Sequence, residues 1–327
     1  MGKVNDIMRH FLIDNERFAD LFNGVCFHGQ KVIHAGDLSE ASEQYTGQEM
    51  NSRLTAGRRS VRIRDIKKRL RTGASLRILA VENQNMVDYT MPFRCLQYDV
   101  MEYGQQLALL RKENEKTGCY LSGAEKLCKI KKADKLTPVY TLCLYHGEAK
   151  WDGPRTLGEM MDFGENADGM KALFADYPMK LYCINEMDDF TVFHSDIRAL
   201  FQAMQYRADK NGMKKMLQED SLYRHLSEDT VEALAVMLNM PGIWEERQRF
   251  MWKNEEGEGY NMCLAIQEWK QEEREEGREE GREEGIGALI EICREFGLLK
   301  DAVAAKIKTK FMLEEGQEQI YMEKYWK

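Results

Sequence analysis

The chain has 327 residues, of which 43% are hydrophobic and 31% are charged, with a formal net charge of −8 at pH 7. This length allows one large domain or two ordinary ones, and the composition is close to a globular average. No apolar run approaches the roughly 20 residues that a bilayer crossing requires, so we expect no membrane span. The N-terminus lacks the apolar core of a secretion signal, which predicts a cytoplasmic protein.

The N-terminal part of the chain combines a helical pattern with a β-prone one. Apolar residues recur at helical spacing between Asp14 and Asn23, and Gly24 ends the pattern, which predicts a helix. Residues 25–33 then read as a strand or hairpin. The polar stretch over residues 38–55 is expected to be helical or loose.

Alternating apolar residues dominate the next part of the chain. They predict two strands at residues 60–68 and 75–84, separated by a turn at residues 72–74. Asp88 or Thr90 can cap the helix that follows. The later predicted elements are, in chain order, strands at residues 139–145 and 180–184 and helices at residues 195–207 and 227–239. This order predicts an α/β or α+β fold with a mixed sheet.

The tail contains the tetrapeptide Arg-Glu-Glu-Gly three times over residues 274–285. Glu and Arg at helical spacing support a helix by a few tenths of a kcal/mol per pair, whereas each interior Gly destabilises it by about 1 kcal/mol relative to Ala. We therefore expect a marginal helix in a solvated connector. An amphipathic segment follows, and its apolar face, which is expected to need a partner, comprises Ala288, Leu289, Ile292, Phe296 and Leu299.

The eight cysteines are scattered, and no two of them form a Cys-x-x-Cys clip. In a chain without a recognisable secretion signal we interpret them as reduced, mostly buried thiols. None of the six histidines pairs with a cysteine at ligand spacing, so no zinc site is expected.

Positive charge is concentrated between Arg53 and Arg77, where Asp65 is the single acid. Local rather than net charge governs contact with a phosphate backbone. This pattern predicts DNA contact, with a solvated sheet edge as the alternative. The residues expected to contact DNA are Arg58, Arg59, Arg62, Arg64 and Lys68.

Each of the two neighbouring strands carries a carboxylate on an apolar face. Period-two alternation places Asp65 on the face of Ile63, and Glu82 on the face of Ala80 and Gln84. Two such carboxylates are costly to bury unpaired, so either a cation neutralises them or they point to solvent. Mg²⁺ suits them, because two carboxylates leave positions for waters and a phosphate oxygen. The Gln84 amide can orient water or phosphate but supplies no positive charge.

Three stretches of the chain resemble a known family. They are RIRDIKKRL, LAVENQNMVDYTMPFRCLQYDVMEYGQQ and TPVYTLCLYHGEAKWDGPRTL, and the charged repeats of the tail fit the same pattern. Together they resemble the PD-(D/E)XK nuclease core in the form found in the recombination-promoting nuclease, or transposase-like, family of bacteria. The resemblance covers most of residues 5–209.

The resemblance implies a fold and a domain order. The fold is α/β, with a PD-(D/E)XK restriction-endonuclease-like core, a mixed central sheet flanked by helices and a helical C-terminal extension. The nuclease-like domain would span residues 1–210 and the helical extension residues 211–268. The repeat tether and the C-terminal amphipathic helices would occupy residues 269–327.

The resemblance also implies roles for particular side chains. Asp65 and Glu82 would bind Mg²⁺ or Mn²⁺, and Gln84 would replace the usual Lys. Lys67, together with Arg94 and Tyr98 of the following helix, would reach the site or its phosphate. An acid on the first predicted helix, either Asp20 or Glu16, would complete the site, and the sequence does not choose between these two.

These observations favour a Mg²⁺-dependent DNA endonuclease with a role in recombination, mobile elements or defence. One alternative is a catalytically weak or idle DNA-binding or scaffold protein that keeps the nuclease fold. Another is a partner-binding module that forms a homodimer through its C-terminal helices. His146 is interpreted as a strand-end residue rather than a general base, since no recognisable nucleophile lies near it in the sequence.

Overall fold

The computed structural model describes residues 3–41, 44–47, 60–63, 65–73, 75–165, 167–254 and 257–326. These residues form two compact units, Met1–Asn261 and Met262–Lys327. The first unit contains the central sheet and is the part of the chain that concerns the candidate site. No helix among the described residues has the length and apolar character needed to span a membrane.

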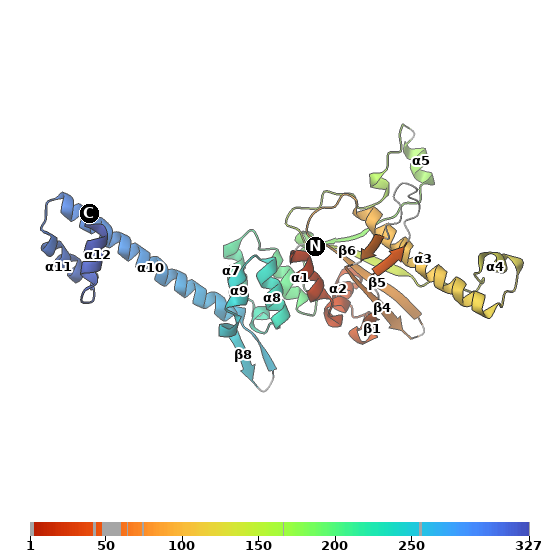
Figure 1. Cartoon of the computed structure of the whole chain (residues 1–327), viewed down its shortest axis with the longest axis horizontal. Helices are drawn as coiled ribbons and strands as arrows, with labels where there is room; N and C mark the ends of the chain where they lie inside the picture. The colour runs from red at the N-terminus through yellow and green to blue at the C-terminus, as the bar shows by residue number, and fades with distance from the viewer. Residues whose placement is uncertain are drawn as a thin grey trace. The chain divides into compact units, whose positions relative to one another are not determined.

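The central sheet of the first unit has five strands in the order β1-β4-β5-β6-β7. Their bounds are Leu38–Glu40, Ile66–Thr72, Ser75–Gln84, Val139–Tyr145 and Lys180–Cys183. Strands β1, β4 and β5 pair antiparallel, whereas β5, β6 and β7 pair parallel. The prediction of an α/β fold with a mixed sheet is therefore confirmed (Figure 1).

Strand β5 lies in the middle of the sheet and is buried on both faces. Its run from Ile78 to Asn83 is buried at every position, as expected for a strand with apolar residues on both sides. In the register of the sheet, Ala80 lies opposite Lys67 of β4 and Thr141 of β6. The predicted bounds of this strand, residues 75–84, are confirmed.

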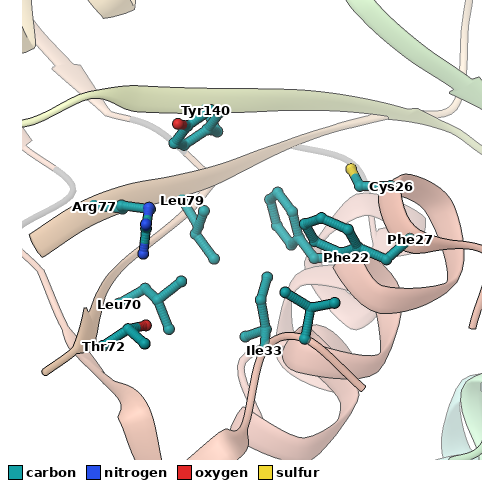
Figure 2. A pocket seen from close by; sticks show the side chains of 10 residues that line it. Phe22, Cys26, Phe27, Ile33, Leu70, Thr72, Arg77, Leu79 and Tyr140 are labelled. Atoms are coloured by element: carbon teal, nitrogen blue, oxygen red, sulfur yellow. The ribbon is translucent and has the colours of Figure 1, made fainter. Parts of the chain in front are cut away.

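Helices α1 (Lys3–Leu12) and α2 (Asn15–Phe27) precede the sheet, and α2 packs on one of its faces. Figure 2 shows Phe22 and Phe27 of α2 on one side of a cavity of about 510 Å³ and Leu79 of the sheet on the other. Leu79 points to the opposite face from Glu82, because the two are separated by an odd number of positions in β5. Helix α2 therefore covers the face away from Glu82.

Helix α3 (Met91–Thr117) covers the other face and projects beyond the sheet towards α4 (Gly123–Cys128) (Figure 1). Thr90 occupies the capping position before the helix, although its side chain makes no capping hydrogen bond, and Pro92 lies in the first turn. The buried residues that α3 shares with β6, β7 and the neighbouring loops are Met91, Cys95, Cys143, Tyr145, Trp151, Met179 and Cys183. All eight cysteines of the chain are free.

Several predicted elements differ from the structure. Residues 25–33 are not a strand: α2 continues to Phe27, and His28 and Gly29 then take left-handed conformations with φ of 51° and 83°. The predicted strand 60–68 is two strands, β3 (Ser60–Ile63) and β4, and Asp65 lies at the bend before β4. β3 pairs with β2 (Gln44–Gly47) in a separate ribbon, so part of the stretch expected to be helical or loose is extended.

The remaining α-helices and strands of the first unit complete its helical part and add a small hairpin. They are α5 (Ala167–Leu173), α6 (Ile197–Met204), α7 (Lys210–Glu219), α8 (Glu228–Met237), α9 (Pro241–Glu245), β8 (Met251–Asn254) and β9 (Gly257–Tyr260). Arg17 of α2 ties this part to the N-terminus. Its guanidinium contacts Asp196 at 2.9 Å and Asp229 at 3.0 Å.

The second unit consists of α10 (Met262–Glu295), α11 (Lys300–Phe311) and α12 (Gln317–Tyr325). The Arg-Glu-Glu-Gly repeats lie inside α10, so the segment expected to be marginal is one continuous helix. The predicted apolar face was also misplaced, because Phe296, just beyond the end of the helix, is 81% exposed. The buried cluster of this unit is Ile286, Ile290, Cys293, Val303, Ile307, Leu313 and Met322.

Candidate active site

Asp65 and Glu82 lie next to each other at the end of the sheet where β4 begins and β5 ends. The two strands are antiparallel with Ile66 opposite Val81, so one further step along this register brings Asp65 beside Glu82. The backbone N–H of Asn83 donates a hydrogen bond of 2.8 Å to Oδ2 of Asp65, which fixes this carboxylate against β5. The structure thus brings together the two carboxylates that the sequence singled out.

Both carboxylates are withdrawn from solvent. Asp65 is 7% exposed and Glu82 is 1% exposed. Tyr98 of α3 lies close to both: burial first, then the charge of Glu82 and that of Asp65, raise the pKa of its phenol. A phenol with a raised pKa keeps its proton at neutral pH and remains a hydrogen-bond donor beside the two negative charges.

Arg94, one helical turn before Tyr98 on α3, supplies a fixed positive charge. Burial opposes that charge, but the hydrogen bonds and charges of Asp88 and Tyr98 raise the pKa of Arg94 overall. Asp88 in turn accepts hydrogen bonds from the backbone N–H and the hydroxyl of Thr90 at the start of α3. The predicted pair Arg94 and Tyr98 is therefore a hydrogen-bonded unit on the face of Glu82.

Lys67, two residues after Asp65, forms a buried ion pair beneath α3. Its Nζ lies 3.0 Å from Oε2 of Glu102, and the two side chains are 5% and 8% exposed. The structure thus places Lys67 in an internal pair rather than at an open phosphate site. Glu102 was not singled out from the sequence, although it continues the four-residue spacing of Arg94 and Tyr98 along α3.

Gln84 ends β5 on the face of Glu82 and is half-buried. Its backbone oxygen accepts a hydrogen bond of 2.9 Å from the N–H of His146. Arg9 of α1 supports the other strand, because its Nε donates a hydrogen bond of 2.7 Å to the backbone oxygen of Asp65. No sequence pattern predicted α1, so the role of Arg9 could not be foreseen.

Asp20 and Glu16 lie on α2, which covers the opposite face of the sheet. The carboxylate of Asp20 accepts hydrogen bonds from the backbone N–H groups of His194 and Ser195, and from the hydroxyl of Ser195. Both acids line a separate hollow beside these residues. The structure therefore does not bring either of them to Asp65 and Glu82, and Asp20 is a structural anchor for the loop before α6.

The residues predicted to contact DNA fall mostly outside what the structure describes. Arg58, Arg59 and Arg64 lie outside the described residues, and for Arg62 only the backbone in β3 is described.

Lys68 is described, and it is 1% exposed. Its Nζ donates hydrogen bonds to the backbone oxygen of Ile13, to Asn15 and, at 3.1 Å, to Glu40. The structure therefore places Lys68, which was predicted to contact DNA, inside the protein with its charge paired by these groups.

The chemistry of the carboxylate pair fits a hard divalent cation. Asp65 and Glu82 offer oxygen ligands from adjacent strands, and Mg²⁺ typically takes one or two carboxylates together with waters and substrate phosphates. Among the described residues there is no cluster of three or more His, Cys, Asp or Glu side chains that could form an all-protein metal cage. The pair therefore suits an ion that shares its ligands with water and a phosphate.

His146 directly follows β6 and is 1% exposed. Burial, and then the charge of Arg207, lower the pKa of its imidazole from 6.5 to about 3. An imidazole held neutral at this depth does not act as a proton-transferring base near pH 7. This placement agrees with the interpretation of His146 as a strand-end residue.

The pKa of His146 predicts a pH dependence of stability. The unfolded chain takes up a proton below about pH 6.5, whereas the folded chain does so only near pH 3. The contribution of His146 to the free energy of unfolding is therefore fully present above about pH 6.5. It is lost by up to about 1.4 kcal/mol per pH unit as the pH drops towards 3. Urea unfolding between pH 7 and pH 4.5 should show this slope in wild type and a shallower one in His146→Asn. The exposed residue His34 provides the control His34→Asn, which should keep the wild-type slope. If His146→Asn also keeps the wild-type slope, this assignment is refuted.

One comparison with known proteins gives a match. A family model described as "Putative transposase, YhgA-like" matches residues 69–232, which is half of the chain. The matched region contains Glu82, Gln84, Arg94 and Tyr98 and begins shortly after Asp65. No curated protein and no solved structure matches the chain.

Proposed function

The chain belongs to the YhgA-like family of putative transposases, and we propose that it is a metal-dependent nuclease that hydrolyses phosphodiester bonds in DNA. The observation that carries the proposal is the meeting of Asp65 and Glu82, both buried, at one edge of a mixed sheet beneath α3. The family name supports a role in mobile elements or recombination, which we propose as the biological setting.

Each side chain of the site has a definite role in this proposal. Asp65 and Glu82 hold the divalent ion, which when bound would polarise the phosphoryl group and stabilise the charge that develops on it. Asn83 keeps Asp65 in place through the hydrogen bond from its backbone N–H. Gln84, two residues beyond Glu82, orients the attacking water or a phosphate oxygen through its amide.

Arg94 and Tyr98 compensate for the neutral Gln84. A Lys at position 84 would bring a cation to the site, and Gln does not. Arg94 is held by Asp88 and Tyr98, and Tyr98 feels the charges of Glu82 and Asp65. This arrangement supports a positive charge close to the site without Lys at position 84. Fixed charges of this kind stabilise a developing negative charge without reorganising during the reaction.

The experiment that tests the proposal is a nicking assay on supercoiled plasmid with Mg²⁺, with Mn²⁺ and with EDTA. We expect nicked or linear product with either metal and none with EDTA, because two carboxylates alone cannot supply the electrophile. Absence of cleavage with both metals, in a preparation that still binds the plasmid, would contradict the proposal.

A catalytically idle DNA-binding protein is the second candidate. The observation that favours it is the buried ion pair of Lys67 and Glu102. Because Lys67 is engaged in this pair, it does not supply a positive charge to a phosphate at the site, which would weaken catalysis. Such a protein would bind DNA with an affinity that falls steeply as salt increases, because binding releases counterions from the phosphates. Salt-dependent binding without metal-dependent cleavage would establish this function in place of the first.

A further inference from the structure

Arg207 and His146 form a polar cluster that the nuclease proposal does not use. Nη1 of Arg207 donates a hydrogen bond of 2.7 Å to the backbone oxygen of His146. Within the described part of the chain, neither Nε nor Nη2 of Arg207 has a hydrogen-bond partner, and neither ring nitrogen of His146 has one. All four atoms are buried, and unsatisfied polar groups of this kind are strongly unfavourable unless something pairs with them.

The cluster borders a cavity of about 580 Å³ at the carboxyl ends of β5 and β6. Asn85, which follows β5, and His146, which follows β6, both line this cavity together with Arg207. The carboxyl ends of parallel strands are the usual place for ligands in sheets of this type. None of Asp65, Glu82 and Gln84 lines the cavity, so it is separate from the candidate active site.

Gly147 shapes the wall of the cavity. A Cβ atom at this position would lie 2.7 Å from the backbone oxygen of Asn85 and would overlap the ring of Tyr145. Only glycine therefore allows the chain after β6 to lie this close to the chain after β5. The close approach keeps His146 and Asn85 at the same cavity.

The unpaired groups suit an oxyanion with a phosphate geometry. Nε and Nη2 form one edge of the guanidinium, and this edge donates two parallel hydrogen bonds to two oxygens of a phosphate or carboxylate. One ring nitrogen of the neutral imidazole of His146 is an N–H donor, which can pair with a third oxygen of the same phosphate, whereas the other ring nitrogen points away on the far side of the ring. A carboxylate has only two oxygens, both of which Arg207 would engage, so it leaves this donor without a partner.

Charge at the cavity limits what can bind. Among the described residues that line it, Glu148 is the one acid, and Arg207 lines it as well. Burial lowers the pKa of Arg207 below its usual value, and the charge of Glu148 opposes this effect only in part. A group with a single negative charge balances Arg207, and each further charge meets repulsion from Glu148, most of all on a polyphosphate.

We propose that Arg207 and His146 form a binding site for a single phosphate group, of the kind present at the end of a nucleic acid strand or on a nucleoside monophosphate. Arg207 holds two phosphate oxygens through Nε and Nη2, and His146 pairs with a third. The site is independent of the carboxylate pair and does not require nuclease activity.

The test measures stabilisation by inorganic phosphate in the presence of EDTA, which removes any contribution from a divalent ion. Ligand that binds only the folded chain raises the unfolding temperature in a saturable way. We expect this rise in wild type. In Arg207→Gln the apparent affinity should be at least about tenfold weaker, because the charged bidentate pair is lost, and in Arg207→Lys the loss should be smaller. The exposed residue Arg111 on α3 provides the control Arg111→Gln, which should respond as wild type does.

The two sources of the phosphate are distinguished by two further probes. A 5′-phosphorylated oligonucleotide is compared with its 5′-hydroxyl form, and adenosine monophosphate with adenosine. Preference for the phosphorylated oligonucleotide over the monophosphate assigns the site to nucleic acid ends, and the reverse assigns it to a free nucleotide.

The proposal is overturned if inorganic phosphate does not stabilise wild type, since water then fills the cavity. It is equally overturned if Arg207→Lys and Arg207→Gln respond to phosphate as wild type does. Should Arg207→Gln fail to fold, ³¹P line broadening of phosphate by wild type and by His146→Asn decides the matter. Equal broadening by the two proteins contradicts the proposal.

Discussion

Replacement of Asp65 with Asn, or of Glu82 with Gln, is expected to reduce the rate of metal-dependent DNA cleavage by more than about 100-fold. A bound ion contributes several kcal/mol to the stabilisation of the transition state, and each 1.36 kcal/mol corresponds to a tenfold change in rate. The amide side chains keep the shape of the carboxylates but remove the charge that holds the ion. The assay is plasmid nicking at saturating Mg²⁺, compared with wild type purified in parallel.

The same variants separate a catalytic role from a structural one. Glu82 is 1% exposed, so replacing its charge with a neutral amide removes a buried charge that lies beside Asp65. In EDTA the Glu82→Gln variant should therefore be at least as stable to urea as wild type. Asp168→Asn, at an exposed acid of α5, is the matched control and should cut as wild type does. Cleavage that survives both active-site substitutions would show that another site does the chemistry.

Replacement of Lys67 with Met is expected to lower the free energy of unfolding by about 3–5 kcal/mol. The reason is that this change leaves the carboxylate of Glu102 buried beneath α3 without its lysine. Removal of both members, in Lys67→Met with Glu102→Leu, should recover most of the loss, because a well-packed apolar pair replaces a buried ion pair at little cost. Urea unfolding of the two single variants and the double variant gives the coupling energy.

The hairpin of β8 and β9 offers a matched control for this cycle. Lys253 and Glu258 lie at the same separation of 3.0 Å, but their side chains are 72% and 64% exposed. Lys253→Met should leave the free energy of unfolding almost unchanged, because an exposed ion pair gains little over hydration. A loss for Lys67→Met as small as that for Lys253→Met would show that the inner pair is not buried in solution.

The part of the site that lies within two neighbouring strands could be predicted from the sequence. Alternation along residues 75–84 placed Glu82 and Gln84 on one face, and the pairing of β4 with β5 brings Asp65 beside Glu82. The spacing of Arg94 and Tyr98 gave them a common face on the following helix, which the structure confirms. Patterns of this kind are local, because they depend only on the period of a strand or a helix.

The parts that failed depend on packing between distant segments. Lys67 and Lys68 look equivalent in a basic stretch, but the first pairs with Glu102 of α3 and the second with Asn15 and Glu40. The placement of Asp20 depends on which face of the sheet α2 covers. The periodicity of a sequence does not show which face a helix will cover. The error at residues 25–33 is an exception with a local cause: helix α2 includes the β-prone residues up to Phe27, and the left-handed turn at His28 and Gly29 then ends it.

Binding of Mn²⁺ to the metal-free chain, measured as the loss of the free-ion signal in electron paramagnetic resonance, tests directly whether Asp65 and Glu82 hold a metal ion. We expect a Mn²⁺ site in wild type whose affinity falls at least about tenfold in Asp65→Asn and in Glu82→Gln, since mutation even of residues that only support metal ligands changes affinity by about 10–100-fold. Asp168→Asn should bind as wild type does. Identical Mn²⁺ binding by wild type and Glu82→Gln would contradict the assignment of Asp65 and Glu82 as the metal site.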